Sequence, residues 1–273
     1  MKPNILLISI AVLIIAACNK SPSEEIRDDF KKYYDQYQVE GSFVLYDQRN
    51  DKYIFYNKNQ YNQGFSPAST FKICNTLIGL ETGVIKDQNF VIPWDSVVRN
   101  PIWDKDHNLK TAFANSTVWY YQELARRIGG ARMKYWLDKA KYGNADTSGG
   151  IDQFWLSGGL RISPHQQIEF LKQLQSNSLP FSKRSIAILK EIMITQNTKN
   201  YTIRSKTGWG IYGNKDAGWD VGYLETKGNV FYFVNCIQVD SKALTDTNRS
   251  INFGKSRVEI VDSILYKLGL TRE

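Results

Sequence analysis

Ser69 and Lys72 stand three residues apart, and a serine and a lysine at that spacing can act as a nucleophile and its base. Ser66 and Pro67, just before them, are typical of a helix start, with the serine at the N-cap and the proline at the first helical position. A helix from there to about Gly83 would place Ser69 and Lys72 on one face. Ser69 would lie in the first turn, where unpaired N–H groups favour a developing anion. The spacing therefore predicts a serine capable of acyl transfer.

The same pattern also fits a purely structural role. Ser-x-x-Lys is short enough to occur by chance, and a serine near a helix start usually caps the helix. A lysine can act as a base only after losing its proton, and apolar surroundings promote this loss by lowering the pKa. The neighbours of Lys72 are apolar, namely Phe71, Ile73, Leu77, Ile78 and Leu80. A Ser-His-Asp mechanism has little raw material, because His107 and His165 are the chain's two histidines.

Patterns along the chain predict the elements that must position this pair. The 273 residues are 42% hydrophobic and 13% aromatic, which is enough for a substantial core. Strand-like runs stand at both ends, and helical periods stand in the middle. The predicted strands are 41–46, 52–56, 201–207, 217–226 and 230–239. The predicted helices after the one at Ser66 are 116–128, 132–140, 164–175 and 183–194, with terminal helices at 26–37 and 257–268.

These elements indicate an α/β fold of the α+β type. One antiparallel sheet would be built from both chain ends and flanked by the terminal helices, with a helical subdomain inserted between them. The mixed part would comprise about 28–62 and 200–273, and the helical part about 63–199. Segment 86–108 is predicted to be a loop, and 143–159 a glycine-rich surface segment. A site is expected in the cleft between the parts, faced by the strand around Gly218 to Gly222, to which we assign no chemistry.

The N-terminus has the pattern of an exported protein. Lys2 precedes an apolar run from Ile5 to Ala16, which is short for a membrane-spanning helix and ends in small residues, as a secretory signal does. Cys18, directly after them, resembles the lipidated cysteine of a bacterial lipobox. Lipidation would make it the mature N-terminus of a membrane-anchored periplasmic lipoprotein; the alternative is an ordinary signal peptide with a chance cysteine. We expect the signal at 1–17, a tether at 18–27 and the folded domain at 28–273.

Charge and cysteine content argue against two classes of function. The net charge is +8, and removal of 1–17 with its single lysine leaves 34 basic against 27 acidic side chains. No basic run is interleaved with aromatic residues, so nucleic-acid binding is not expected. Cys74 and Cys236 belong to no C-x-x-C motif and no histidine cluster, so no metal is expected. We expect buried free thiols, and a disulfide stays open.

Three further motifs follow the serine and lysine. Ser116-Thr117-Val118 opens a predicted helix, Tyr142-Gly143-Asn144 closes another, and Lys206-Thr207-Gly208 ends a predicted strand. In this order S-x-x-K, S-x-V, Y-G-N and K-[ST]-G resemble a class D, oxacillinase-type serine β-lactamase of the penicillin-recognising enzymes. The resemblance covers about residues 40–270. It implies the serine β-lactamase/DD-peptidase-like fold and hydrolysis of the β-lactam amide bond of penicillin-type antibiotics through a serine acyl-enzyme, giving antibiotic resistance.

The resemblance implies roles for the partners of the nucleophile. Ser116 would pass a proton to the leaving β-lactam nitrogen, or else only cap its helix. Lys206 would supply positive charge near the substrate carboxylate, and Thr207 would offer that carboxylate a hydroxyl. Gly208 would permit close approach of the strand to the substrate. The N–H of Trp209 would form the oxyanion hole together with that of the nucleophile.

In the resembled family the lysine is carbamylated by CO₂, and the carbamate is the general base for acylation and for hydrolysis. Lys72 would accordingly be N6-carboxylysine, with CO₂ or bicarbonate and no other cofactor required. Trp155 matches the tryptophan whose N–H holds the carbamate, and Val118 would keep the lysine pocket dry. Arg257 is expected to bind the substrate carboxylate, with Arg249 as the alternative.

Two rival functions stay open at this point. A β-lactam sensor resembles class D enzymes closely but stays acylated. A penicillin-binding peptidase would also deacylate slowly, although Trp155 and the S-x-V motif argue against it. The expected partners are β-lactam small molecules, and membrane contact is expected only through Cys18. Monomer and homodimer are both open. The substrate spectrum, including carbapenems, depends on loop shapes around Ile102, Trp103 and Tyr212.

Overall fold

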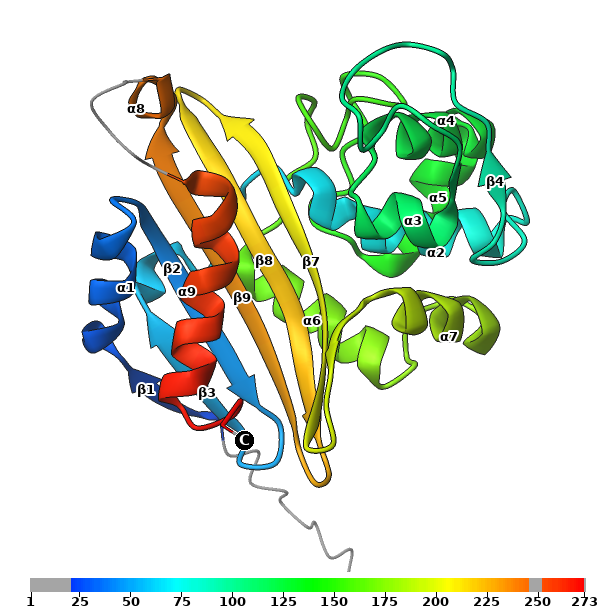
Figure 1. Ribbon diagram of the computed structural model, residues 1–273. Coiled ribbons are helices and arrows are strands. Elements are labelled where there is room, and N and C mark those ends of the chain that lie inside the picture. The colour runs from blue at the N-terminus through cyan, green and yellow to red at the C-terminus, as the bar shows by residue number, and fades with distance from the viewer. Residues whose placement is uncertain (1–20, 246–251, 273) are drawn as a thin grey trace, which may run out of the picture.

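The computed structural model describes residues 21–245 and 252–272. Its centre is a seven-stranded sheet in the order β1-β3-β2-β9-β8-β7-β6 (Figure 1). The strands are β1 (Ser23–Ile26), β2 (Glu40–Asp47), β3 (Lys52–Tyr56), β6 (Ile194–Asn197), β7 (Tyr201–Tyr212), β8 (Lys215–Thr226) and β9 (Val230–Asp240). Two short strands, β4 (Val91–Ile92) and β5 (His107–Asn108), pair with each other in the otherwise irregular segment 86–108.

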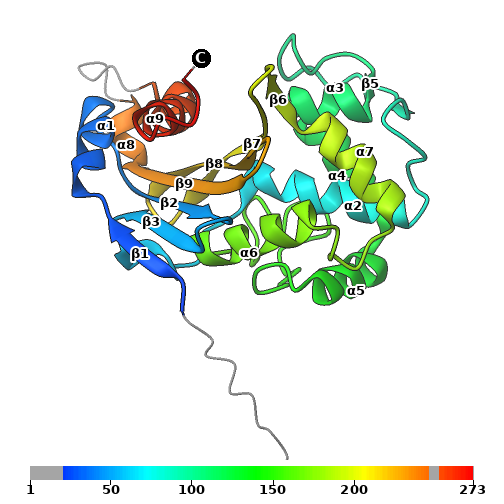
Figure 2. The ribbon, with the colours of Figure 1, turned by 90° about the horizontal axis from the view of Figure 1, so that it is seen from below.

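The helices cover both faces of the sheet and fill a separate region beyond one edge. On one face lie α1 (Lys31–Gln36) and α9 (Phe253–Lys267), and on the other lies α6 (Pro164–Gln175) (Figure 2). Beyond the edge at β7 and β6 gather α2 (Lys72–Glu81), α3 (Leu109–Ala114), α4 (Val118–Ile128), α5 (Gly130–Ala140) and α7 (Lys183–Ile192). The short α8 (Ser241–Thr245) follows β9. The predicted fold class is therefore confirmed.

Alternation of side chains along the strands explains why the sheet has two buried faces. On β9, Phe233 packs with Ile260 and Ile264 of α9, while Tyr232 and Val234 belong to the cluster on the opposite face. The predicted 41–46/52–56 hairpin is confirmed as β2 and β3, and β7, β8 and β9 form an antiparallel meander as predicted. Each of the last three strands is longer than the sequence pattern indicated.

The N-terminal region differs from the prediction. Residues 23–26, expected to belong to a tether, form β1 and pair in parallel with β3, so the sheet is not wholly antiparallel. Without β1, strand β3 would be an edge strand with unpaired backbone groups. The added segment pairs with that edge: Arg27 N donates to Phe55 O at 2.7 Å, and Ser23 N donates to Asp51 O at 3.0 Å. The helix expected from residue 26 begins only at Asp28, as a 3₁₀ turn. The signal and Cys18 lie outside the described residues, in which no helix is long and apolar enough to cross a membrane.

Three further differences concern the middle of the chain. Helix α3 was not predicted; it is capped by Asn108, whose side chain accepts a hydrogen bond from Thr111 N. The helix expected to reach residue 194 ends at Ile192, and the next residues form β6. Segment 143–159 is not all surface, because Phe154 and Trp155 are completely buried in it.

The two described cysteines are free and buried. Cys74 lies in α2 and Cys236 in β9, each within the apolar cluster that joins the helical region to the sheet. Burial raises the pKa of both thiols, so they pack as small apolar side chains. This confirms the expectation of buried free thiols and decides against a disulfide between them.

Candidate active site

The turn that carries Ser69 is a 3₁₀ turn over Ala68–Phe71, and α2 begins only at Lys72. The predicted α-helical first turn and the N-cap at Ser66 are therefore wrong. Ser66 Oγ donates instead to the carbonyls of Trp155 and Leu156, at 3.0 and 3.1 Å. Ala68 has a φ of 47°, in the left-handed region, and this bend prevents a continuous helix from Ser66.

Ser69 and Lys72 meet as the sequence predicted. Lys72 Nζ donates a hydrogen bond to Ser69 Oγ at 2.7 Å, and the lysine is completely buried while the serine is partly exposed. Burial lowers the pKa of Lys72 well below its usual value, and the charge of Lys206 lowers it further. The ring of Tyr121, from α4, lies 5.3 Å from Nζ. The surroundings therefore favour an uncharged amine next to the hydroxyl.

Lys206 and Ser116 form a second pair. Lys206 Nζ donates to Ser116 Oγ at 3.1 Å and to Thr207 O at 3.2 Å. Burial and Arg257 lower the pKa of Lys206 to about 7, and the nearby carboxylate of Asp220 opposes this shift. Ser116 is not the cap of α4, because Thr117 occupies the N-cap position and Ser116 has a left-handed φ of 53°. Its hydroxyl is thus available to Lys206.

Strand β7 runs directly against the Ser69 turn at a glycine. A Cβ on Gly208 would lie 2.9 Å from the carbonyl oxygen of Pro67, so a side chain there would push strand and turn apart. Arg257 Nη1 donates to Gly208 O at 2.6 Å, and its guanidinium lies 5.6 Å from the Trp209 ring. Arg257 therefore lies beside the K-T-G strand, and its role in binding the substrate carboxylate stays a prediction. Arg249 lies outside the described residues.

Trp155 is completely buried beside the turn. Its carbonyl accepts a hydrogen bond from Ala68 N at 3.0 Å, and its ring lies 5.3 Å from that of Phe71. Its Nε1 is buried and has no hydrogen-bond partner among the described residues. A buried N–H without a partner is uncommon and points to an acceptor that the unmodified side chains do not provide.

The Y-G-N motif holds the chain segment that follows Trp155. Gly143 has a φ of 56°, and a Cβ there would lie 2.2 Å from Arg161 O. Asn144 Nδ2 donates to Gly159 O at 3.0 Å, and Asn144 Oδ1 accepts from Arg161 N at 2.9 Å. The motif thus fixes the chain on the C-terminal side of Trp155, which is a structural contribution.

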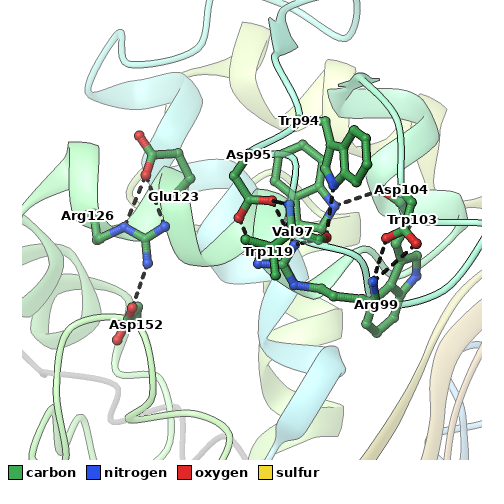
Figure 3. A network of polar contacts seen from close by, with 10 residues as sticks. All are labelled: Trp94, Asp95, Val97, Arg99, Trp103, Asp104, Trp119, Glu123, Arg126 and Asp152. Carbon is green, nitrogen blue, oxygen red and sulfur yellow. Dashed lines mark hydrogen bonds and ion pairs between the residues drawn. The ribbon is translucent and has the colours of Figure 1, made fainter.

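The loop beside Ser116 is held by a polar network (Figure 3). Arg99 forms an ion pair with Asp95 at 2.7 Å. Trp119 Nε1 donates to Trp103 O at 2.9 Å, and Trp103 Nε1 donates to Asn115 O at 3.0 Å. These bonds connect the 94–104 loop to the residue that precedes Ser116. The exposed Ile102 is carried on the same loop.

Comparisons with known proteins agree with this arrangement. Residues 33–265 match the protein family described as the penicillin binding protein transpeptidase domain. The chain is 44% identical to the β-lactamase OXA-48 of Klebsiella pneumoniae over 202 residues, or 74% of this chain and 76% of that protein. The crystal structure of a class D β-lactamase from Sebaldella termitidis matches with a TM-score of 0.85 at 35% identity, covering 92% of this chain and 100% of the other. This chain belongs to the class D β-lactamase family.

This chain also resembles part of a regulatory protein. The regulatory protein BlaR1 of Bacillus licheniformis is 34% identical over 246 residues, which are 89% of this chain but 39% of the regulator. The likeness therefore concerns a minor part of that longer protein.

Two neighbours of this class D site were not predicted from the sequence. Tyr121 covers Lys72 Nζ, and its position three residues after Val118 on the predicted helix was the available signal. Asp220 stands directly opposite Thr207 in the β7–β8 ladder and is 3% exposed. Its burial, with Asp262 nearby, raises its pKa to about 7. A single acidic residue within the buried run Ala217–Leu224 of β8 was the signal here.

Proposed function

We propose that this protein hydrolyses the β-lactam amide bond of penicillin-type antibiotics through an acyl-enzyme on Ser69. The 2.7 Å contact between Ser69 Oγ and the buried Lys72 Nζ carries the proposal. An uncharged amine at that position can take the hydroxyl proton as Oγ attacks the carbonyl carbon. The C–N bond of the ring then breaks and leaves the acyl group as an ester on Ser69. Water attacks this ester and releases the ring-opened product.

The leaving nitrogen needs a proton, and Ser116 would deliver it. Its hydroxyl accepts a hydrogen bond from Lys206 Nζ, so a proton given up by Ser116 can be replaced from the ammonium. The pKa of Lys206, about 7, suits proton exchange near neutral pH. Both groups would thus act on the departing side of the amide bond.

We further propose that Lys72 carries a carbamate formed from CO₂. A neutral amine is required for that addition, and burial favours it. The unpartnered Trp155 Nε1 fits a carbamate oxygen as its acceptor. When present, the modification would supply a carboxylate-type base at Lys72. Val118, the first residue of α4 and half-buried, would help to keep water from the pocket.

The remaining groups of β7 would bind the substrate. The Thr207 hydroxyl, the Lys206 ammonium and the Arg257 guanidinium offer donors and positive charge to the carboxylate of a penicillin. The N–H groups of Ser69 and Trp209 would receive the carbonyl oxygen as it becomes negative. Gly208 lets the strand lie close enough to the turn for both N–H groups to serve one oxygen.

Nitrocefin turnover tests the hydrolase proposal. We expect hydrolysis that accelerates with added bicarbonate and that disappears in Ser69→Ala. Ser178→Ala, at an exposed serine outside the site, is the matched control and should keep the wild-type rate. Turnover that persists in Ser69→Ala would contradict the proposal.

A β-lactam sensor is the second candidate, favoured by the likeness to BlaR1. A sensor, like a slow penicillin-binding peptidase, would remain acylated. Intact-mass spectrometry after a pulse of benzylpenicillin separates these functions. An adduct that vanishes within the time of turnover supports the hydrolase, and an adduct that persists for hours supports the sensor or peptidase.

We propose that the protein is exported and held at a membrane by lipidation of Cys18. The small-small-Cys sequence after an apolar run supports this proposal. Fractionation of cells tests it, because Cys18→Ser should move the protein from the membrane fraction to the soluble fraction of the periplasm. Unchanged membrane association of Cys18→Ser would contradict the lipid anchor.

A further inference from the structure

A cavity of about 380 Å³ lies beside the K-T-G strand. Alternate residues of β7 face α9, so Ser205 and Thr207 line this cavity on the α9 face of the sheet. Its walls are otherwise mainly apolar, with Phe233 from β9 and Leu265 from α9 among them. It reaches solvent at the exposed Gln196. The volume is that of a small-molecule site, for which about 300–1,000 Å³ is typical.

One oxygen of a buried carboxylate in this cavity has no hydrogen-bond partner among the described residues. Asp220 lines the cavity, is 3% exposed, and its Oδ1 has no hydrogen-bond partner among the described residues. An unpartnered buried carboxylate is costly, and proteins normally satisfy such a group with a donor or a cation. The structure thus combines a mainly apolar cavity with one carboxylate oxygen that lacks a hydrogen bond.

The nearby cations of the chain do not satisfy this carboxylate oxygen. Lys206 directs its ammonium at Ser116 Oγ and Thr207 O. Arg257 directs Nη1 at Gly208 O and Nε at Gly254 O. Both side chains therefore donate elsewhere, which leaves Asp220 Oδ1 free to accept from a ligand.

We propose that this cavity binds a small organic cation, an ammonium or amidinium group on a hydrophobic body. The cationic group donates to Asp220, and the body packs against Phe233, Val261 and Leu265. A second carboxylate, that of the exposed Asp262, lines the cavity and attracts the same charge. The site goes beyond the proposed hydrolysis, because neither Ser69 nor Lys72 takes part in it. Lys206 and Thr207, which would bind the substrate, also line the cavity.

Calorimetric titration of the purified protein with benzylammonium at pH 8 tests the site. We expect binding to the wild type, at least about tenfold weaker binding to Asp220→Asn, and a similar loss when neutral benzyl alcohol replaces benzylammonium. Affinity should rise about tenfold between pH 6 and pH 8, because Asp220 must be ionised and its pKa is about 7. The charged groups that face it are Asp262, Arg257 and Lys206.

Two further variants keep the test independent of folding and of catalysis. Val258→Trp places a large side chain at the half-exposed rim of the cavity and should abolish binding while leaving the melting temperature near that of the wild type. Ser69→Ala should bind benzylammonium as the wild type does. The binding test is therefore independent of the test of the hydrolase proposal. Absence of binding to the wild type, or unchanged affinity in Asp220→Asn or Val258→Trp, would overturn the site.

Discussion

The active site contains two buried lysines, and the charged groups that surround them differ. Lys72, on α2, has no carboxylate among the groups that shift its pKa; burial and the charge of Lys206 both lower it. Lys206, on β7, has Asp220 nearby, which raises its pKa against the effects of burial and Arg257. Lys72 is thereby suited to be an uncharged base, and Lys206 to be a cation that titrates near neutral pH.

The comparison also shows that the two lysines depend on each other. A positive charge on Lys206 makes a second charge on Lys72 more costly, which favours the neutral amine beside Ser69. Asp220 pairs with Thr207 across the β7–β8 ladder and therefore acts on the charge of Lys206 from the opposite face of the sheet. One carboxylate therefore distinguishes the two environments.

Replacing each lysine by alanine should produce the largest difference between the two positions. Lys72→Ala removes the base, so we expect kcat for nitrocefin to fall by about 10²–10⁴, with no recovery in bicarbonate. Lys206→Ala removes a charged hydrogen-bond donor to the substrate and the proton source for Ser116, so we expect a rise in KM of about 10- to 100-fold and a smaller loss of kcat than in Lys72→Ala. Steady-state kinetics at fixed pH measures both. Equal losses of kcat in the two variants would break the comparison.

Pushing β7 away from the turn that carries Ser69 should have the next largest effect. Gly208→Ala would place a Cβ 2.9 Å from Pro67 O, and such overpacking costs about 1–3 kcal/mol of unfolding free energy. Urea denaturation measures this loss. Gly228→Ala is the control, because the nearest atom to its Cβ lies 3.9 Å away. Equal stability of the two variants would show that strand and turn are not tightly apposed.

Loss of the buried indole N–H should act on the Lys72 side alone. In Trp155→Phe we expect nitrocefin turnover to fall about tenfold at ambient CO₂, the equivalent of one charge-assisted hydrogen bond, and to recover in high bicarbonate. The control is Trp136→Phe, at a partly buried tryptophan in α5. A Trp155→Phe enzyme with wild-type turnover at every bicarbonate concentration would remove Trp155 from the mechanism.

Removing the Asp220 carboxylate should change the charge of Lys206 and should have the smallest effect of the four changes. Asp220→Asn takes away the charge that raises the pKa of Lys206, so this pKa should fall below about 7. Fewer Lys206 side chains are then charged at neutral pH, and the rise of KM for benzylpenicillin with pH should begin at lower pH. A pH profile of KM measures the shift. An unchanged profile would show that Asp220 does not set the charge of Lys206.

The sequence was sufficient to predict the fold class and the contact between Ser69 and Lys72. Hydrophobic alternation placed the strands, and three short motifs singled out Ser69, Lys72, Ser116 and Lys206; the structure adds that Lys206 contacts Ser116. These features are local or carried by motifs, so they can be read without knowing the tertiary structure.

The remainder depends on contacts between distant parts of the chain. The turn at Ala68 is fixed by a bond to Trp155 O, 87 residues away, and an alanine gives no sign of a positive φ. β1 forms because β3 offers a free edge, which the composition of residues 23–26 does not reveal. Asp220 acquires its role from its position opposite Thr207 and from burial under α9, neither of which is local in sequence.

The central claim is that Lys72 is a buried uncharged amine that takes up CO₂, in contrast to Lys206. The most direct measurement is ¹³C NMR of the protein in ¹³C-bicarbonate, with Lys72→Ala and Lys206→Ala as paired controls. We predict one carbamate resonance in the wild type that is absent from Lys72→Ala and retained in Lys206→Ala, and whose intensity rises in parallel with nitrocefin turnover. A wild-type spectrum without the resonance, or a resonance that survives in Lys72→Ala, would contradict the account.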